Sequence, residues 1–281
     1  MATTTERPRR YAVLIDADNA QASTLKGILG EVAKLGEAAV KRIYGDFTSP
    51  HSNSWKPHLN AHAIKPVQQF AYTTGKNATD IALIIDAMDL MYTRRFDGFV
   101  LVSSDSDFTS LASRLREEGL ETIGFGRQTT PQAFRNACNR FVLTEVLRPS
   151  ADTEDVQPPV DEVGRVGTAS PPASVPSVVP PLAAVSPEPF PLEFIRKGIE
   201  QTSDEGGWVR LSKLGSYLRQ LQPDFDERRY GFKLLNQLLR SRPQSFEVRA
   251  GEGPQGSKVL SVKLKTAAKG KPRAKVTPAS V

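Results

Sequence analysis

Apolar runs that end in carboxylates constrain the fold of this sequence most. Residues 98–102 read Gly-Phe-Val-Leu-Val and precede Asp105 and Asp107, and residues 11–15, Tyr-Ala-Val-Leu-Ile, run directly into Asp16. A strand that is apolar at every position is buried on both faces, which is typical of a parallel sheet. Helical spacing of apolar residues between such runs indicates that strands and helices alternate. The sequence therefore predicts an α/β fold whose parallel sheet is covered by helices on both faces.

The expected elements follow one another regularly through the first half of the chain. Thr79 is the expected N-cap of one helix, and Gly119 is expected to end another. We expect strands at 11–15, 38–44, 62–67, 98–103 and 120–125, helices at 22–35, 79–91, 106–118 and 131–138, and a last strand or loop at 141–146.

The carboxylates fall where a parallel sheet binds ligands. The carboxyl ends of its strands meet at one edge, and ligands bind beyond them near a switch in strand order. If strands 11–15 and 98–103 are neighbours, Asp16 and Asp18 meet Asp105 and Asp107 there, and Asp80 can join them from the first turn of its helix. Each acid taken alone is explained equally well as a helix cap or a turn residue.

The combination of these acids points to a cation. Neighbouring carboxylates repel one another and raise one another's pKa unless positive charge neutralises them. Hard divalent ions such as Mg²⁺ or Mn²⁺ prefer carboxylate oxygens. The sequence therefore predicts a divalent metal site at this edge of the sheet.

Composition places the chain among cytoplasmic globular proteins. The single cysteine, Cys138, excludes an internal disulfide and is typical of a reducing compartment. No apolar stretch approaches the roughly 20 residues of a membrane helix, and the N-terminus lacks the apolar core of a signal peptide. The net charge of +6 is compatible with a polyanionic partner.

A Pro- and Ser-rich segment divides the chain. Residues 149–190 carry six acids and a single base, Arg165, and lack aromatic residues before Phe190. Such a segment cannot bury enough surface to fold, so we expect a disordered linker. The expected domains are then 1–148 and 191–265, followed by a basic disordered tail at 266–281 that is either simply solvated or a phosphate-binding arm.

The first domain resembles a known family. LIDADNA, GKNATDIALIIDAMDL and FDGFVLVSSDSDFTSLASRLREEGLETIGFG, within residues 11–147, resemble an NYN domain, which is a PIN-like Rossmannoid fold, and its LabA-like bacterial branch. The resemblance implies a metal-dependent ribonuclease. It places Lys76 and Thr79 in the motif before a helix and gives Asp86 a secondary position. It also implies an acidic metal site formed by Asp16, Asp80, Asp105 and Asp107, with Asn19 as an accompanying polar residue.

The chemistry expected from such a site is phosphodiester hydrolysis. A bound Mg²⁺ or Mn²⁺ lowers the pKa of water and stabilises charge on phosphoryl oxygens, so no carboxylate needs to form a covalent intermediate. The three histidines, His51, His58 and His62, lack a zinc pattern and are better explained as part of a loop that contacts substrate or is solvated. Tyr44 either stacks on a base or packs in the core.

Residues 191–265 predict three helices and a two-stranded wing, a small α+β winged helix. GWVRLSKLGSYLRQLQPDFDERRYGFKLLNQLLRS resembles the OST-HTH/LOTUS family, whose members bind RNA or dock protein partners. We place Arg229, Lys233 and Arg240 near or on the third helix, where spacings of four and seven let them share one face suited to phosphates. The alternative is a solvated helix face without a ligand.

These patterns give one hypothesis and its competitors. The first is a metal-dependent ribonuclease, of endonuclease type, whose LOTUS domain holds RNA on a flexible tether, with Lys76 also contacting RNA. A non-catalytic adaptor that binds RNA or protein is the alternative, and a phosphatase or DNA nuclease could use the same acids. A protein partner and a homodimer are left open, and no membrane partner is expected.

Overall fold

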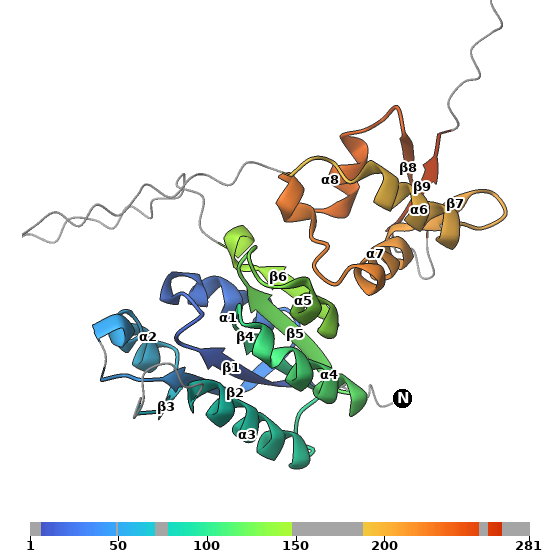
Figure 1. The fold of residues 1–281 in the computed structure, drawn as a ribbon. Coiled ribbons are helices and arrows are strands. Elements are labelled where there is room, and N and C mark those ends of the chain that lie inside the picture. The colour runs from blue at the N-terminus through green and yellow to red at the C-terminus, as the bar shows by residue number, and fades with distance from the viewer. Residues whose placement is uncertain (1–6, 49, 71–77, 148–187, 253–257, 266–281) are drawn as a thin grey trace, which may run out of the picture.

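A computed structural model describes residues 7–48, 50–70, 78–147, 188–252 and 258–265, which form two folded domains (Figure 1). The expected tail and all of the expected linker except residues 188–190 lie outside the described residues, as does Lys76. No helix in the described ranges is long and apolar enough to cross a membrane.

The N-terminal domain alternates strands and helices as expected. Its strands are β1 (Arg10–Asp16), β2 (Glu37–Gly45), β3 (Lys65–Gln68), β4 (Gly98–Val102), β5 (Glu121–Gly126) and β6 (Arg140–Leu143). Its helices are α1 (Leu25–Ala33), α2 (Lys56–Ala61), α3 (Ala78–Tyr92), α4 (Thr109–Glu117) and α5 (Gln132–Ala137), with 3₁₀ turns η1 (Ala22–Thr24), η2 (Pro50–Ser54), η3 (Ser106–Phe108) and η4 (Thr144–Leu147).

The six strands form one parallel sheet in the order β3-β2-β1-β4-β5-β6. Strands β1 and β4 are therefore neighbours, with Ile15 opposite Val102, as the site prediction required. The strand order reverses direction between them, because the chain extends from β1 to β3 on one side and from β4 to β6 on the other. This switch point is where open α/β sheets bind ligands.

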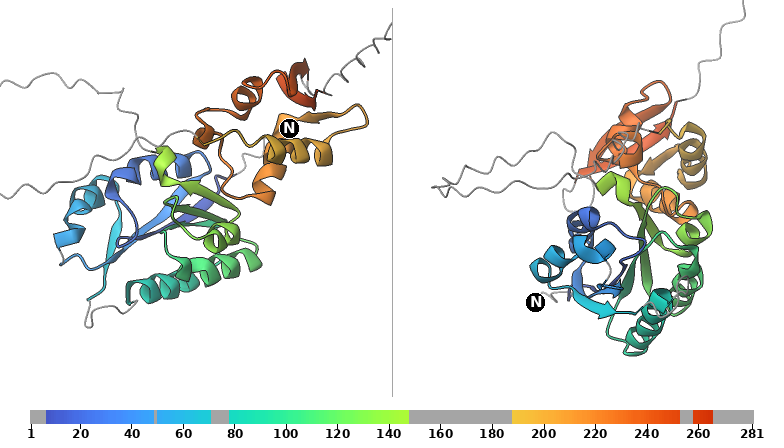
Figure 2. Two further views of the ribbon diagram at one scale, coloured as in Figure 1. Left: turned by 45° about the horizontal axis from the view of Figure 1, so that its top comes forward. Right: turned by 60° about the vertical axis from the view of Figure 1, so that its left-hand side comes forward.

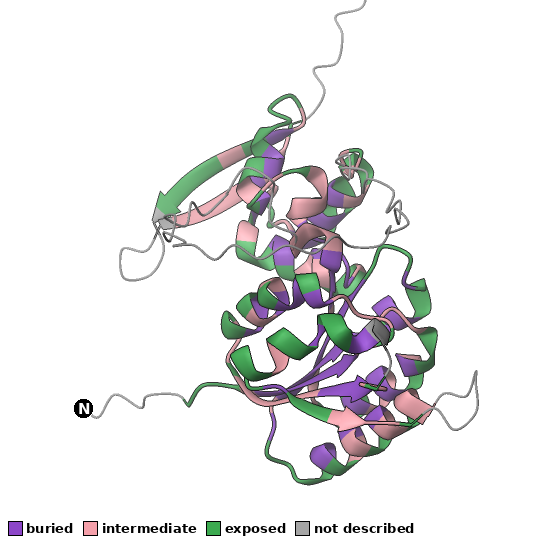
Figure 3. Cartoon of the chain, turned by 90° about the vertical axis from the view of Figure 1, so that its left-hand side faces the viewer, coloured by how far each residue is buried: buried purple, intermediate pink, exposed green. Residues whose placement is uncertain are grey.

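Both faces of the sheet are covered, which confirms the predicted fold class (Figure 2). Helices α3, α4 and α5 pack on one face against Leu14 and Leu101, while α1 packs on the other face against Val13 and Val100. Because successive strand residues point to opposite faces, these apolar runs supply both cores at once. Figure 3 shows the central strands of this sheet as a buried layer between helices that expose their outer surfaces, whereas β2 and β3 are largely intermediate or exposed.

Several local expectations differ from the structure. Helix α3 begins at Ala78, so Thr79 lies in its first turn and is not its N-cap. His58 lies on the short helix α2, and His62 directly follows it, so this stretch is not the expected loop. Gly119 has a φ of +77°, a left-handed conformation that glycine adopts without a steric penalty, and the chain turns there after α4 as predicted.

The C-terminal domain is a small α+β fold, as predicted. Helices α6 (Leu192–Thr202), α7 (Leu211–Leu221) and α8 (Leu235–Arg240) pack around a three-stranded antiparallel sheet with a turn, η5 (Glu227–Tyr230), before α8. The sheet has the order β7-β9-β8, formed by β7 (Trp208–Arg210), β8 (Phe246–Glu252) and β9 (Lys258–Leu264). Strand β7 was not expected from the sequence.

The expected third helix is shorter than its apolar spacing indicated. Gly231 has a φ of +83° and ends the turn η5, and α8 begins only at Leu235. Arg229 lies in η5 and Lys233 in the connecting segment, so the expectation that they share a helix face with Arg240 is wrong.

The two domains contact each other directly along strand β6 and helix α5 (Figures 1 and 2). The Phe141 amide on β6 donates a hydrogen bond of 2.9 Å to the Pro223 carbonyl, so this edge strand has a backbone partner in the C-terminal domain. The Arg135 guanidinium of α5 pairs with the Asp224 carboxylate at 2.9 Å, and both side chains are buried.

One more ion pair crosses the interface, and further pairs within the C-terminal domain support it. Arg228 contacts Glu31 of α1 at 2.8 Å while it also pairs with Asp226 of its own domain. Arg229, whose side chain is 10% exposed, pairs with Glu188 and Asp224. Glu188 and Phe190, which the sequence analysis assigned to the linker, thus contact the C-terminal domain. These contacts dock the domain, so its attachment does not depend on the linker alone.

Candidate functional site

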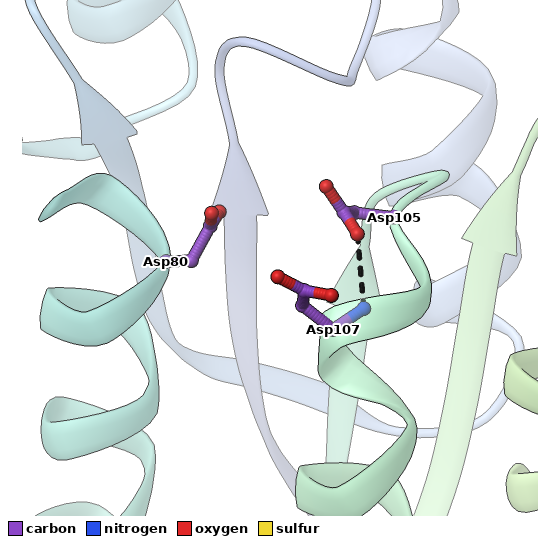
Figure 4. A group of neighbouring side chains, drawn as sticks. All are labelled: Asp80, Asp105 and Asp107. Atoms are coloured by element: carbon purple, nitrogen blue, oxygen red, sulfur yellow. Dashed lines mark hydrogen bonds between the residues drawn. The ribbon is translucent and has the colours of Figure 1, made fainter. Parts of the chain in front are cut away.

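Three carboxylates converge at the switch point of the sheet. One oxygen from each of Asp80, Asp105 and Asp107 lies within 4.8 Å of the other two, which is a spacing that could hold a metal ion. Figure 4 shows Asp80 reaching in from the start of α3, while Asp105 and Asp107 approach from the turn that precedes α4. Three acidic oxygen donors suit a hard divalent cation such as Mg²⁺ or Mn²⁺.

The local sequence fixes this geometry. Strand β4 ends at Val102, and Asp105 then caps η3, because its carboxylate accepts the Asp107 amide at 2.9 Å. This cap turns the backbone so that the Asp105 and Asp107 side chains lie next to each other. Asp80 occupies the first turn of α3, which brings it to the same edge from the other side of β1.

The carboxylates around Asp80 favour the binding of a cation. Burial raises the pKa of Asp80 to about 6, and the neighbouring carboxylates of Asp16, Asp105 and Asp107 add to the shift. The repulsion identified from the sequence is therefore present in the folded chain. A divalent cation would favour the ionised form of Asp80 and reverse this shift.

Asp16 lies near Asp80 but is not one of the three acids that converge, and a metal site formed by all four acids stays a prediction. Asp16 is fully buried, and burial raises its pKa. Its oxygens accept hydrogen bonds from the amides of Asp18 and Asn19, from the Asn19 side chain at 2.9 Å and from the Ser103 hydroxyl at 2.7 Å. The structure gives Asn19 the role of holding Asp16.

Sequence reasoning missed Ser103. Its hydroxyl donates to Asp16 and accepts the Asp105 amide at 3.0 Å, so it connects the end of β1 to the turn that carries two of the acids. Its position directly after an apolar strand, beside two carboxylates, was the available signal.

Asp86 and Tyr44 lie away from the converging acids. Asp86 pairs with Arg42 and accepts the Tyr44 hydroxyl. Tyr44 is fully buried, so it packs in the core and cannot stack on a base. His58 and His62 stack on each other, with ring centroids 6.1 Å apart, and neither belongs to the acidic group.

A hollow of about 750 Å³ extends to Thr79, the residue before Asp80, but none of the three converging acids lines it. It is bordered by the loop after β1, by η2 and by the start of α3, where Thr79 precedes Asp80. Its walls combine polar groups with the aromatic side chains of Trp55 and Phe70, and Phe70 is 52% exposed. Neither aromatic residue was expected at the site from the sequence.

The predicted RNA-contacting residues have different environments. The Arg229 guanidinium is held by Glu188 and Asp224 in the domain interface. Lys233 and Arg240 are exposed, on separate elements. Lys76 lies in a segment that the structure does not describe.

Comparison with known protein families identifies both domains. Residues 10–145 match the NYN domain, and residues 187–257 match the OST-HTH/LOTUS domain. The chain is an NYN domain protein with an OST-HTH/LOTUS domain. NYN domains are a PIN-like family of nucleases, and LOTUS domains bind RNA. Assignment of this NYN domain to the LabA-like branch stays a prediction.

Similar solved structures name no activity. A crystal structure of a protein of unknown function from Vibrio parahaemolyticus has 18% identity and a TM-score of 0.42, covering 50% of this chain and 96% of its own. A solution NMR structure of an uncharacterized protein from Nitrosomonas europaea has 30% identity and a TM-score of 0.29, covering 40% of this chain and all of its own. No curated protein matches the chain.

Proposed function

We propose that this protein is a metal-dependent ribonuclease that acts in the cytoplasm. The observation that carries the proposal is the convergence of Asp80, Asp105 and Asp107, from two separate elements, at the ligand-binding edge of a nuclease-family fold. Endonucleolytic cleavage suits an open hollow that extends to Thr79, the residue before Asp80, because a chain can lie in it without presenting an end.

The residues have distinct proposed roles. Asp80, Asp105 and Asp107 would hold Mg²⁺ or Mn²⁺, which when bound lowers the pKa of water and stabilises charge on the phosphoryl oxygens. Asp16 positions the site: its buried carboxylate holds Ser103, and Ser103 in turn holds the backbone of Asp105. Asn19 fixes Asp16 through its side-chain amide.

The substrate proposal rests on the second domain. A LOTUS domain would bind RNA and raise its local concentration beside acids that otherwise repel a polyanion. The interface with β6 and α5 would keep this domain at a fixed position relative to the acidic site. The exposed Lys233 and Arg240 are candidates for phosphate contacts.

Cleavage of an end-labelled single-stranded RNA tests the proposal. We expect fragments with Mn²⁺ or Mg²⁺ and none in EDTA. Asp105→Asn should abolish cleavage, because it removes a ligand, but should leave RNA binding largely intact. Asp16→Asn should also abolish cleavage, because an amide cannot accept all the hydrogen bonds that hold the site.

Three results would count against the proposal. Equal fragments from the wild type and both variants would indicate a contaminating nuclease. Absence of fragments with RNA still bound would favour the adaptor function instead. Cleavage of DNA but not of RNA would retain the metal site and overturn the substrate.

A further inference from the structure

The sheet of the LOTUS domain has one face in the core and one in solvent. Val209, Val248 and Val262 lie opposite one another in the register; Val209 and Val262 are buried in the core cluster of this domain, and the partly buried Val248 packs against it. Because side chains alternate along a strand, their neighbours point to the other face. These neighbours form two cross-strand rows, Trp208-Lys263-Glu247 and Arg210-Ser261-Arg249.

The Trp208 ring on this outer face lies close to two cationic side chains. The Arg249 guanidinium carbon lies 3.8 Å from the centroid of the Trp208 ring, and the Lys263 ammonium lies 6.0 Å from it. Arg249 is exposed and Trp208 is half-buried. A guanidinium held over an indole presents a flat cationic surface, and RNA-binding proteins stack nucleobases on such surfaces.

The backbone fixes the position of the ring. The Asp204 carboxylate accepts the Trp208 amide at 2.8 Å, and the Asp204 amide donates to the Trp208 carbonyl at 2.9 Å. Gly207 has a φ of +76°, and a Cβ there would lie 3.2 Å from the Lys263 side chain. The turn before β7 therefore requires glycine, and it delivers Trp208 to the outer face in a defined place.

The same face borders an open hollow of about 690 Å³. Trp208, Arg210 and Arg249 line it, together with Lys213, whose ammonium donates to the Thr202 carbonyl at 3.0 Å. With Lys263, four basic residues stand around this face against two acidic ones, Asp204 and Glu247. The charge is complementary to phosphate, and the hollow gives a nucleotide room beside the ring.

We propose that this outer face, formed by Trp208, Arg249, Lys263 and Arg210, is the single-stranded RNA site of the LOTUS domain. A base stacks on the Trp208–Arg249 pair, and Arg210 and Lys263 contact the flanking phosphates. The inference rests on the proposed function and deepens it, because it replaces the helix stripe expected from the sequence with a sheet face. Single strands suit this site because their unpaired bases are free to stack.

Fluorescence anisotropy of the full chain with a short labelled single-stranded RNA tests the site. EDTA is present so that the RNA stays intact. Arg249→Ala with Lys263→Ala should weaken binding at least about tenfold, since it removes the guanidinium that stacks with the base and a cation that contacts phosphate. The comparison pair, Lys233→Ala with Arg240→Ala, removes the same charge from the candidate phosphate contacts near α8 and should weaken binding less. Circular dichroism checks that both double variants are folded.

A second readout reports stacking directly. Trp208→Phe keeps an aromatic ring and should give an intermediate loss of affinity. RNA should protect Trp208 from acrylamide quenching, and polyglutamate should not. Trp55, the other tryptophan, is 2% exposed and contributes little to quenching in the absence of RNA.

The outcomes separate the inference from the proposed function. If the comparison pair weakens binding as much as the Arg249 and Lys263 pair, the sheet face is not the site, although RNA binding stands. If polyglutamate competes as well as RNA, the face binds anions generally and the stacking claim is wrong. If the wild-type chain binds no RNA at all, the RNA-binding half of the proposed function fails together with this inference.

Discussion

Breaking the ion pair between Arg135 and Asp224 should undock the LOTUS domain. The two side chains are 8% and 2% exposed and lie 2.9 Å apart, so Arg135→Ala leaves a carboxylate in a site with little water. Removing one partner of a buried pair costs about 3–5 kcal/mol. We expect about 3 kcal/mol, the lower end of that range, because Arg229 still contacts Asp224 at 3.0 Å. That energy corresponds to roughly 150-fold in the docking equilibrium.

Two assays measure this effect. Small-angle X-ray scattering should show a larger radius of gyration for Arg135→Ala than for the wild type. The two tryptophans, Trp55 and Trp208, lie in different domains, so urea unfolding followed by fluorescence should give a single transition for the docked chain and two for the variant. Arg114→Ala is the matched control, because it breaks an exposed pair with Glu118 on the neighbouring helix α4 and should leave docking unchanged.

A double-mutant cycle isolates the pair from other contacts of Arg135. This arginine also donates to the Thr130 and Gln128 carbonyls, so the single variant disturbs the NYN domain as well. With Asp224→Ala as the second change, we expect a coupling energy of at least about 1 kcal/mol. A coupling energy near zero, or an unchanged radius of gyration in Arg135→Ala, would show that the Arg135–Asp224 pair does not dock the LOTUS domain.

Two further predictions concern the acidic site and the sheet. The pKa of Asp80 is about 6 in the folded chain and 3.8 in the unfolded chain, so between these pH values the folded chain binds the proton more strongly. Without metal, Asp80 should therefore make the free energy of unfolding fall as the pH rises from about 3.8 to about 6. In EDTA, Asp80→Asn should remove this pH dependence of stability, and with Mn²⁺ it should remove the rise in Tm that the metal gives the wild type. Thermal melts across pH measure both effects. A Tm rise with Mn²⁺ that is the same in Asp80→Asn would contradict the assignment of Asp80 as a metal ligand. A Cβ at Gly98 would lie 2.4 Å from the Glu121 carbonyl oxygen, so Gly98→Ala should cost about 1–3 kcal/mol of unfolding free energy in urea. Gly30 occupies an exposed position in the middle of α1, where a Cβ would meet nothing within 4 Å, so Gly30→Ala should raise the unfolding free energy by up to about 1 kcal/mol. Equal effects of Gly98→Ala and Gly30→Ala would contradict the steric explanation.

The sheet was predictable because its signal is local. Apolar residues at every position of 11–15 and 98–102 require burial on both faces, and the structure divides those residues between two cores. The carboxyl ends of parallel strands share one edge, which is why acids distant in sequence could be expected to meet. The convergence of Asp80 with Asp105 and Asp107 matches that expectation.

The remaining features depend on contacts that the pattern does not encode. The Asp16 carboxylate accepts four hydrogen bonds, and two of them come from the Ser103 hydroxyl and the Asn19 side chain. The directions in which these two side chains point are not encoded in the local pattern. The pairing of Arg135 with Asp224 joins residues 89 positions apart and has no local signal. The late start of the third helix did have one, since Gly231 stands where a left-handed residue commonly ends a helical turn, and here it ends η5 before α8 begins at Leu235.

Direct measurement of manganese binding tests whether Asp80, Asp105 and Asp107 hold a divalent cation. Electron paramagnetic resonance counts free Mn²⁺ as it is titrated into the wild type, Asp80→Asn and Asp89→Asn. Asp89 is an exposed acid on the same helix α3, so its variant carries the same charge change away from the converging acids. We expect a saturable site that Asp80→Asn loses and Asp89→Asn keeps. Equal binding by both variants, or no saturable binding by the wild type, would contradict this expectation.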